Sequence, residues 1–252
     1  MPELAPSSSY VRQGEKLAAD ALHRIEIAGR DSVKEPDLAV VIEDVFQIDV
    51  AVTDLTDGLD GCAWQTERER LIVLDKTPKW ARQRFTLAHE LGHILAGDAQ
   101  RLIAEEVTVH HSAKISEKRA NCFAACFLMP EGEMRSLGGD FADPDYFAQV
   151  TTHFRVSPIS LAWRLHNLQL LARTKVDQWK NVTAESCAVR AGDPQLVGRE
   201  LARSDAGRIP PRLLTNHLQR FYEGETSARP LAALLEIETD EVMRLLQTVE
   251  PS

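Results

Sequence analysis

The segment His89-Glu90-Leu91-Gly92-His93 constrains this chain more than any other feature of its sequence. Histidines four residues apart lie one turn apart on the same face of a helix, so both imidazoles can reach one metal ion. Glu90 is offset around the helix, where it can take the proton of a water that the metal activates. Zinc hydrolases divide their chemistry in this way. The motif therefore predicts a zinc site with His89 and His93 as ligands and Glu90 as the general base.

The residues around the motif predict a helix that is buried in the core. Thr77 and Pro78 are typical of an N-cap followed by proline at the first helical position, and Gly97 is typical of a helix end. The surface between them is mostly apolar, so the polar groups of the motif need a partner or a ligand. Gly92 costs about 1 kcal/mol in a helix interior relative to alanine. Its presence indicates that another segment packs closely against the helix there.

A zinc site with two histidines needs a third protein ligand and an open position. The carboxylates downstream of the motif are Asp98, Glu105, Glu106 and Glu117. Asp98 follows the predicted helix end and is assigned a capping or turn role. Glu105 and Glu106 stand in an alternating stretch that suggests a strand or a loop. Glu117 is the favoured ligand, because it opens a second helical run that ends at Pro130.

Asn121 lies one helical turn after Glu117, on the same face of this second run. Its side chain can orient a liganding imidazole by a hydrogen bond, and His89 is the expected partner. The alternative interpretation of Glu117 is an ordinary first-turn carboxylate that the helix dipole favours.

Three ordered blocks of the chain resemble the ImmA/IrrE family of metallopeptidases. They are Arg84-Phe-Thr-Leu-Ala-His-Glu-Leu-Gly-His93, then Glu117-x-x-Ala-Asn121-x-Phe-Ala-x-x-Phe-Leu-Met-Pro130, and Val156-Ser157-Pro-Ile-Ser-Leu-Ala-Trp-Arg164-Leu-His-Asn-Leu168. The third block is similar to the helix that usually closes the family's domain. The resemblance covers about residues 10–172. It implies a zincin-like domain and a gluzincin-type site, with His89, His93 and Glu117 as zinc ligands and Glu90 as base.

The resemblance also implies a biological role. Members of the family commonly cut a partner repressor of the helix-turn-helix type, in phage and mobile-element induction, DNA-damage responses and anti-phage systems. We therefore expect a zinc endopeptidase whose substrate is a repressor encoded nearby. Many relatives carry an N-terminal DNA-binding domain, and this chain has no room for one before residue 10, so a transcription-factor role is not expected. The alternative is a non-catalytic regulator with a structural metal, which a fourth protein ligand would favour.

Apolar patterning along the chain predicts a mainly helical α+β fold. Helices are expected over residues 10–29 and 36–46, followed by a β-rich run at 48–53. The segments 62–64 and 71–74 are the best candidates for paired strands. We expect a small antiparallel sheet beside the motif helix, with an edge strand that could bind an extended peptide by strand addition.

The residue that stabilises the oxyanion is left open by the sequence. A peptidase gains from a second electrophile near the carbonyl, often histidine, tyrosine or arginine. The candidates are His110, His111, Tyr146, His153, Arg164 and His166. His110 and His111 could also approach the metal, although exposed loop histidines are the favoured interpretation, and Arg164 is expected in a structural salt bridge.

Residues 1–175 are assigned to the peptidase domain, and residues 176–252 to a linker with a helical C-terminal module. The stretch 181–208 is rich in Gly, Ser, Asp and Arg and ends at Pro210-Pro211, which is typical of a linker. Helices are expected at about 211–223, 227–235 and 239–248. The last two have the shape of a helix-turn-helix, but acidic residues open the second and would repel phosphate. Partner binding or self-association as a homodimer is expected instead.

The charge and the cysteines favour a cytoplasmic enzyme without nucleic-acid binding. The formal net charge is −9, whereas phosphate binding relies on clustered lysine and arginine. No stretch approaches the roughly 18 apolar residues that a membrane span needs, and the N-terminus lacks the order of a signal peptide. The 4 cysteines are few for a disulfide scaffold, and Cys122 and Cys126 are expected to face the core.

Overall fold

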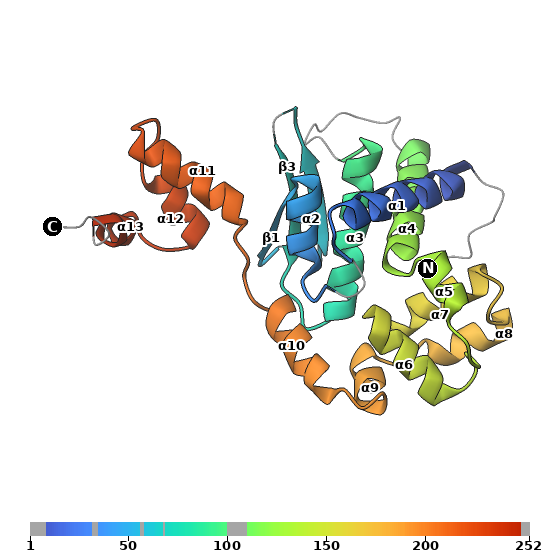
Figure 1. The fold of residues 1–252 in the computed structure, drawn as a ribbon. Coiled ribbons are helices and arrows are strands. Elements are labelled where there is room, and N and C mark those ends of the chain that lie inside the picture. The colour runs from blue at the N-terminus through green and yellow to red at the C-terminus, as the bar shows by residue number, and fades with distance from the viewer. Residues whose placement is uncertain (1–8, 32–34, 56–57, 68, 100–109, 248–252) are drawn as a thin grey trace.

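The computed structural model describes residues 9–31, 35–55, 58–67, 69–99 and 110–247, with the backbone alone at 110–114 and 247. The first elements are α1 (Ser9–Ile27), α2 (Leu38–Phe46), β1 (Asp49–Thr53), β2 (Gly61–Gln65), β3 (Arg70–Asp75), α3 (Trp80–Ala96) and α4 (His110–Leu128) (Figure 1). They are followed by α5 (Glu131–Ser136), α6 (Pro144–Phe154), α7 (Pro158–Asn167), α8 (Arg173–Val176), η1 (Asp177–Trp179), α9 (Ala184–Arg190), α10 (Pro194–Ser204), α11 (Pro211–Tyr222), α12 (Arg229–Leu235) and α13 (Thr239–Gln247). The fold is α+β, as predicted. Among these residues, no helix combines the length and the apolar surface needed to cross a membrane.

The sheet is mixed rather than wholly antiparallel. β2 and β3 pair antiparallel, as the sequence predicted, and their register places Ala63 opposite Ile72. β1 lies on the other side of β3 and runs parallel to it, so the strand order is β1-β3-β2. Apolar alternation identifies a strand but does not say which neighbour it takes. Here the chain passes to the far edge before a hairpin returns it to the centre, and β2 is therefore an edge strand.

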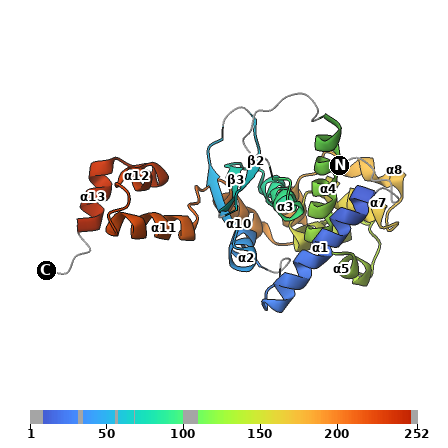
Figure 2. The ribbon, with the colours of Figure 1, turned by 90° about the horizontal axis from the view of Figure 1, so that it is seen from above.

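Helix α3 lies between the sheet on one side and helices α4 and α1 on the other. It packs on β2 and β3, and it also packs on α4, which in turn packs on α1 (Figure 2). The helix starts at Trp80, two residues later than predicted, with Lys79 as its N-cap. The Thr77 hydroxyl accepts a hydrogen bond from the backbone N–H of Lys79 (3.2 Å) and so organises the turn before the helix. The predicted end is confirmed, since Gly97 closes the last turn with φ of 74°.

Helix α4 is longer than the sequence predicted. It begins at His110, so Glu117 lies near its middle, and the interpretation of Glu117 as a first-turn carboxylate is wrong. His110 and His111 start this helix rather than lying in a loop. The candidates Glu105 and Glu106 lie outside the described residues. The predicted closing helix is α7, which Ser157 caps through the N–H of Ser160.

The segment predicted to be a linker packs on the main core. It forms α9, which packs on α6, and α10, which packs on α3. Just before it, Trp179 stacks on Phe147 with ring centroids 3.5 Å apart. At its end, the backbone of Arg208 exchanges hydrogen bonds of 3.0 and 2.9 Å with Val52, and its guanidinium pairs with Glu43. Arg208 thus covers the outer edge of β1.

Helices α11, α12 and α13 form the small helical module that the sequence predicted. Figure 1 shows them apart from the other helices, on the β1 side of the sheet. Their buried core residues are Ala228, Leu231, Ala232 and Val242. Arg212 at the start of α11 donates a hydrogen bond from Nε to Asp49 Oδ1 (3.0 Å) in β1. The division of the chain at residue 175 stays a prediction, and this packing favours a boundary near Pro210.

We expect a chain that ends at residue 209 to melt within a few degrees of the full chain, whereas a chain that ends at residue 175 is strongly destabilised. The shorter chain loses Trp179 and the Arg208–Glu43 pair. Removal of one large buried aromatic side chain costs about 3–5 kcal/mol. Thermal melts followed by circular dichroism measure the difference. Similar melts of the 175-residue chain and the full chain would support the earlier boundary.

Candidate metal centre

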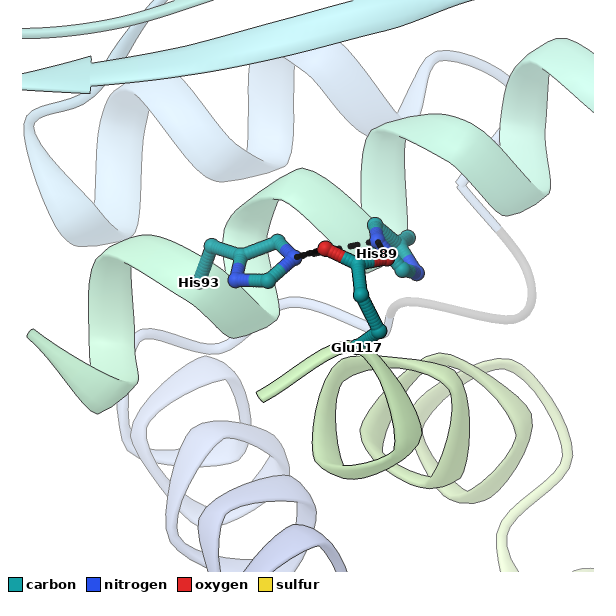
Figure 3. A group of neighbouring side chains, drawn as sticks. All are labelled: His89, His93 and Glu117. Atoms are coloured by element: carbon teal, nitrogen blue, oxygen red, sulfur yellow. Dashed lines mark hydrogen bonds and ion pairs between the residues drawn. The ribbon is translucent and has the colours of Figure 1, made fainter. Parts of the chain in front are cut away.

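His89 and His93 lie one turn apart on the face of α3 that meets α4, as Figure 3 shows. Their Nε2 atoms are 3.1 Å apart. Glu117 reaches both from α4, with Oε2 3.2 Å from His89 Nε2 and Oε1 3.2 Å from His93 Nε2. The structure thus brings together the three residues that the sequence singled out as ligands.

Gly92 sets how closely the two helices approach. A Cβ atom at this position would lie 2.9 Å from Cδ1 of Phe123 on α4, closer than packed carbon atoms come. Phe123 is fully buried and stacks on Phe127 with ring centroids 5.3 Å apart. The expectation that a segment packs closely at Gly92 is confirmed, and this close approach lets Glu117 reach the histidines.

The donor atoms fit a zinc ion. The ligand atoms of His89, His93 and Glu117 all lie within 4.8 Å of one another. Tetrahedral zinc holds nitrogen and oxygen ligands at roughly 2.0–2.2 Å, which places neighbouring donors about 3.3 Å apart. The two Nε2 atoms are 3.1 Å apart and each lies 3.2 Å from a different oxygen of Glu117, which is close to this value. The Glu117 side chain is 52% exposed, so the cluster opens to solvent on that side. Three protein donors with an accessible side are typical of catalytic zinc.

The other ring nitrogen of each histidine, Nδ1, also has a partner. Asn121 Oδ1 lies 3.2 Å from Nδ1 of His89, the contact that the sequence predicted. Asp98 Oδ1 lies 3.2 Å from Nδ1 of His93. The other carboxylate oxygen of Asp98 forms an ion pair with Arg119 of α4. The assignment of Asp98 to a cap or turn was therefore incomplete. An acceptor at Nδ1 favours the tautomer that presents Nε2 to a metal.

The carboxylates around His93 favour its protonated form, whereas a metal would bind the neutral imidazole. Burial lowers the pKa of His93, but hydrogen bonds with Asp98 and Glu117 outweigh it and raise the pKa to about 9. Hydrogen bonds with His89 and His93 hold the pKa of Glu117 far below its usual range. Since a metal needs the neutral imidazole of His93, binding at neutral pH has to release this proton.

Glu90 lies on another face of α3, towards β2. Burial raises the pKa of Glu90, against the charges of the two histidines and a hydrogen bond with the Ala63 backbone in β2. A groove of about 370 Å³ runs beside it, lined by Phe85, Thr86, His89, Glu90 and Asn121, by Arg82, and by residues 58–61. The Glu90 side chain therefore lines a groove between α3 and the segment that leads into β2. A raised pKa suits a base that must later return its proton.

Four of the candidate oxyanion stabilisers are not brought to the cluster in the described structure. Tyr146 of α6 packs on Phe141, which precedes this helix in the chain. His153 lies edge-on to the neighbouring Phe154. On α7, Arg164 donates from Nε to the Met129 carbonyl (3.0 Å) and forms no ion pair with another described residue, so its salt bridge stays a prediction. His166 lies against the Leu171 carbonyl.

His110 and His111 stay open as stabilisers. Their side chains lie outside the described residues, although the helix that they begin is the one that carries Glu117. His110 is seven residues before Glu117, which places it on the same helix face, two turns away.

Replacement of Asp98 by alanine is expected to weaken zinc binding by about 10–100-fold, the usual effect of losing a group that orients a liganding histidine. Asp98→Asn should have a smaller effect, because its amide oxygen can still accept from Nδ1 of His93. The control is Asp20→Ala, which removes an exposed carboxylate on α1 that pairs with Lys16 in the same helix. Competition with a fluorescent chelator measures the affinity, and equal affinities in Asp98→Ala and Asp20→Ala would contradict the assignment.

Comparison with known proteins agrees with this geometry. Residues 34–166, more than half of the chain, match the peptidase family model described as the IrrE N-terminal-like domain. No curated protein matches the chain. The matched region contains His89, Glu90, His93, Glu117 and Asn121, and it starts after α1 and ends within α7. The chain therefore belongs to the peptidase family of the IrrE N-terminal-like domain.

Proposed function

We propose that this protein is a zinc-dependent endopeptidase that cuts a partner regulatory protein, a helix-turn-helix repressor encoded nearby. One observation carries the proposal. Three donor atoms converge from α3 and α4, and Glu90 lies beside them on a groove. Membership of a peptidase family supports the peptide bond as the bond that is cut.

Each residue of the site has a part in this reaction. A bound zinc would supply a Lewis acid for the peptide carbonyl and for the attacking water. Glu90 would accept the proton of that water and later pass it to the leaving amine. Asn121 and Asp98 would hold the imidazoles of His89 and His93 in place through their Nδ1 atoms.

The two edges of the sheet differ in a way that suits substrate binding. Arg208 bridges to Val52 at the edge formed by β1. β2 forms the opposite edge and packs on α3 near Glu90. A substrate segment that adds to β2 as an extended strand would pass along the groove beside Glu90. This mode favours a substrate with an exposed or locally unfolded segment.

The substrate class rests on the resemblance to the ImmA/IrrE family. Cleavage of a repressor would switch on genes of a phage, mobile-element, stress or anti-phage system, and we place this activity in the cytoplasm. The module of α11–α13 is our candidate for partner binding or a homodimer, because Tyr222, Met243 and Leu245 expose apolar surface there. Asp240 and Glu241 open α13 and disfavour direct nucleic-acid binding.

We expect the purified protein to bind about one zinc ion and to cut the repressor encoded beside its gene into two defined fragments. A chelator should stop cleavage, and added zinc should restore it, because the Lewis acid is lost and regained. Mass spectrometry of the fragments locates the cut. A zinc-loaded protein that binds the repressor and leaves it intact would favour the non-catalytic regulator instead.

A further inference from the structure

Different elements support the two histidines of the metal centre. Nδ1 of His89 faces Asn121, which belongs to α4, the helix that carries Glu117. Nδ1 of His93 faces Asp98, which lies two residues beyond the last residue of α3. The Asp98 side chain is 27% exposed, so packing alone does not fix its direction. The orientation of His93 therefore depends on what else holds this carboxylate.

Arg119 of α4 holds the other side of Asp98. Its Nη2 atom donates to Oδ2 of Asp98, whereas Oδ1 of the same carboxylate faces His93. A hydrogen bond between charged groups is roughly twice as strong as one between neutral groups, and a planar guanidinium fixes its direction. The two oxygens of Asp98 are thus divided between the imidazole and the guanidinium. A carboxylate held at both oxygens does not rotate freely.

Gln13 of α1 holds the guanidinium in turn. Nη1 of Arg119 donates to Oε1 of Gln13 (3.1 Å), while Nη2 of the same group reaches Asp98. The two terminal nitrogens of Arg119 therefore bridge α1 and the turn that follows α3. Consecutive contacts lead from α1 through Arg119 and Asp98 to Nδ1 of His93.

Close packing fixes α1 against this part of α4. A Cβ atom at Gly14 would lie 2.9 Å from the carbonyl oxygen of Arg119 and 2.9 Å from Cβ of Cys122, so a larger residue would push the helices apart. Sγ of Cys122 donates to the Val11 carbonyl (3.4 Å). Figure 2 shows α1 lying against α4. This packing places Gln13, which stands between Val11 and Gly14, within reach of Arg119.

We propose that Gln13 and Arg119 are positioning residues of the metal centre, which set the orientation of the His93 imidazole through Asp98. The inference rests on the zinc of the proposed function. It extends the centre to a helix outside the matched family region, since α1 ends at Ile27 and the match begins at residue 34. An orienting partner at a liganding histidine strengthens metal binding, and what holds that partner contributes to the same effect.

Zinc affinities of full-chain variants, measured by competition with a fluorescent chelator, test the proposal. Arg119→Gln should weaken zinc binding about three- to tenfold, which does not exceed the roughly 10–100-fold loss expected in Asp98→Ala, because Arg119 acts only through Asp98. Arg119→Lys keeps the charge and a donor for Asp98, so it should recover most of the affinity. The control is Arg190→Gln, which removes an exposed guanidinium that pairs with Asp145 and should bind zinc as the parent does.

The contribution of α1 is measured separately. Gln13→Ala removes one neutral acceptor from Arg119 and should weaken zinc binding about two- to fivefold, the effect of one ordinary hydrogen bond. The matched control is Gln195→Ala, which makes the same change at an exposed glutamine on α10.

A double variant separates positioning from general stabilisation of the fold. Once Asp98 is replaced by alanine, Arg119 has lost the group through which it acts. Arg119→Gln should therefore cause no further loss of zinc affinity in the Asp98→Ala background. A residue that only stabilised the fold would cause a similar loss in both backgrounds.

Nuclear magnetic resonance of the zinc-loaded chain gives a second test. The Nδ1–H groups of His93 and His89 should donate to Asp98 and Asn121, and Asp98→Asn identifies the His93 signal because it changes that acceptor. Arg119→Gln should move the His93 signal and leave the His89 signal in place. A general loosening of the fold would move both.

Three results would overturn the proposal and leave the proposed function standing. Arg119→Gln could bind zinc as tightly as the parent or more tightly, which would show that the metal senses only the positive charge of Arg119. The double variant could lose further affinity relative to Asp98→Ala. Gln13→Ala could bind zinc as the parent does, which would remove α1 from the metal centre. A parent chain that binds no zinc would contradict the proposed function and this inference together.

Discussion

Replacement of Glu90 by glutamine is expected to abolish peptide cleavage while the fold, the zinc content and partner binding stay as in the parent. Glutamine keeps the shape of the side chain and can still accept a hydrogen bond from the Ala63 backbone, but it cannot accept a proton. Loss of a general base costs about 10²–10⁴-fold in rate. The high end is expected because Glu90 would also orient the water. Initial rates on the repressor, at equal zinc content, measure the factor.

The matched control for this variant is Glu131→Gln. It makes the same chemical change at an exposed glutamate on α5 that pairs with Arg135, so it should cut at the parental rate. In cells, Glu90→Gln should hold the repressor uncut and leave its target genes off. Induction at the parental level by this variant would show that proteolysis is not the working activity.

Replacement of Glu117 by alanine should cause the largest loss of metal. The variant removes a charged donor, so its zinc affinity should fall by more than the roughly 10–100-fold expected when an orienting group is lost. The fold should survive, because the Glu117 side chain is 52% exposed. Zinc per chain after dialysis against a chelator gives the result. Glu90→Gln is the control, since it changes a carboxylate on the adjacent helix and should keep its zinc.

Full zinc occupancy in Glu117→Ala would move the third ligand to Glu105 or Glu106. The variant also has an effect on protonation. One of the two hydrogen bonds that raise the pKa of His93 comes from Glu117, so without it the pKa of His93 should fall from about 9. Histidine C–H chemical shifts followed against pH in the metal-free protein report this change.

The parts of the site that helix periodicity controls could be predicted from the sequence. His89 and His93 are four residues apart, and so are Glu117 and Asn121, so each pair shares one helix face. Gly92 indicated a close neighbour, which is Phe123. These relations depend on local geometry alone, and the resemblance to a known family placed the two helices against each other.

Asp98 was missed because its role depends on how the chain turns after α3. Gly97 has φ of 74°, so the next N–H returns to the helix, and Asp98 N lies 3.1 Å from the His93 carbonyl. This turn directs the Asp98 side chain back to His93. A left-handed glycine followed by a carboxylate, five residues after a liganding histidine, is the signal that could have found it.

The helices α9 and α10 were missed for a different reason. Thr183 and Asp193 cap them, and Pro194 stands at the start of α10, so the residues that begin these helices are those that composition assigns to a linker. What keeps the helices in place is packing on distant segments, such as Trp80 and Ala81 against Ala184. Sequence spacing does not carry that information.

Because the three donors come from two helices, a bound metal would link the supply of that metal to the lifetime of the protein. Two donors come from α3 and one from α4, so an ion bound by all three would fasten two helices that pack together in the core. A ligand that binds only the folded state adds about 1.4 kcal/mol of stability for each tenfold excess over its dissociation constant. Cells low in free zinc would then degrade this protein faster, and they would lose the enzyme as well as its activity.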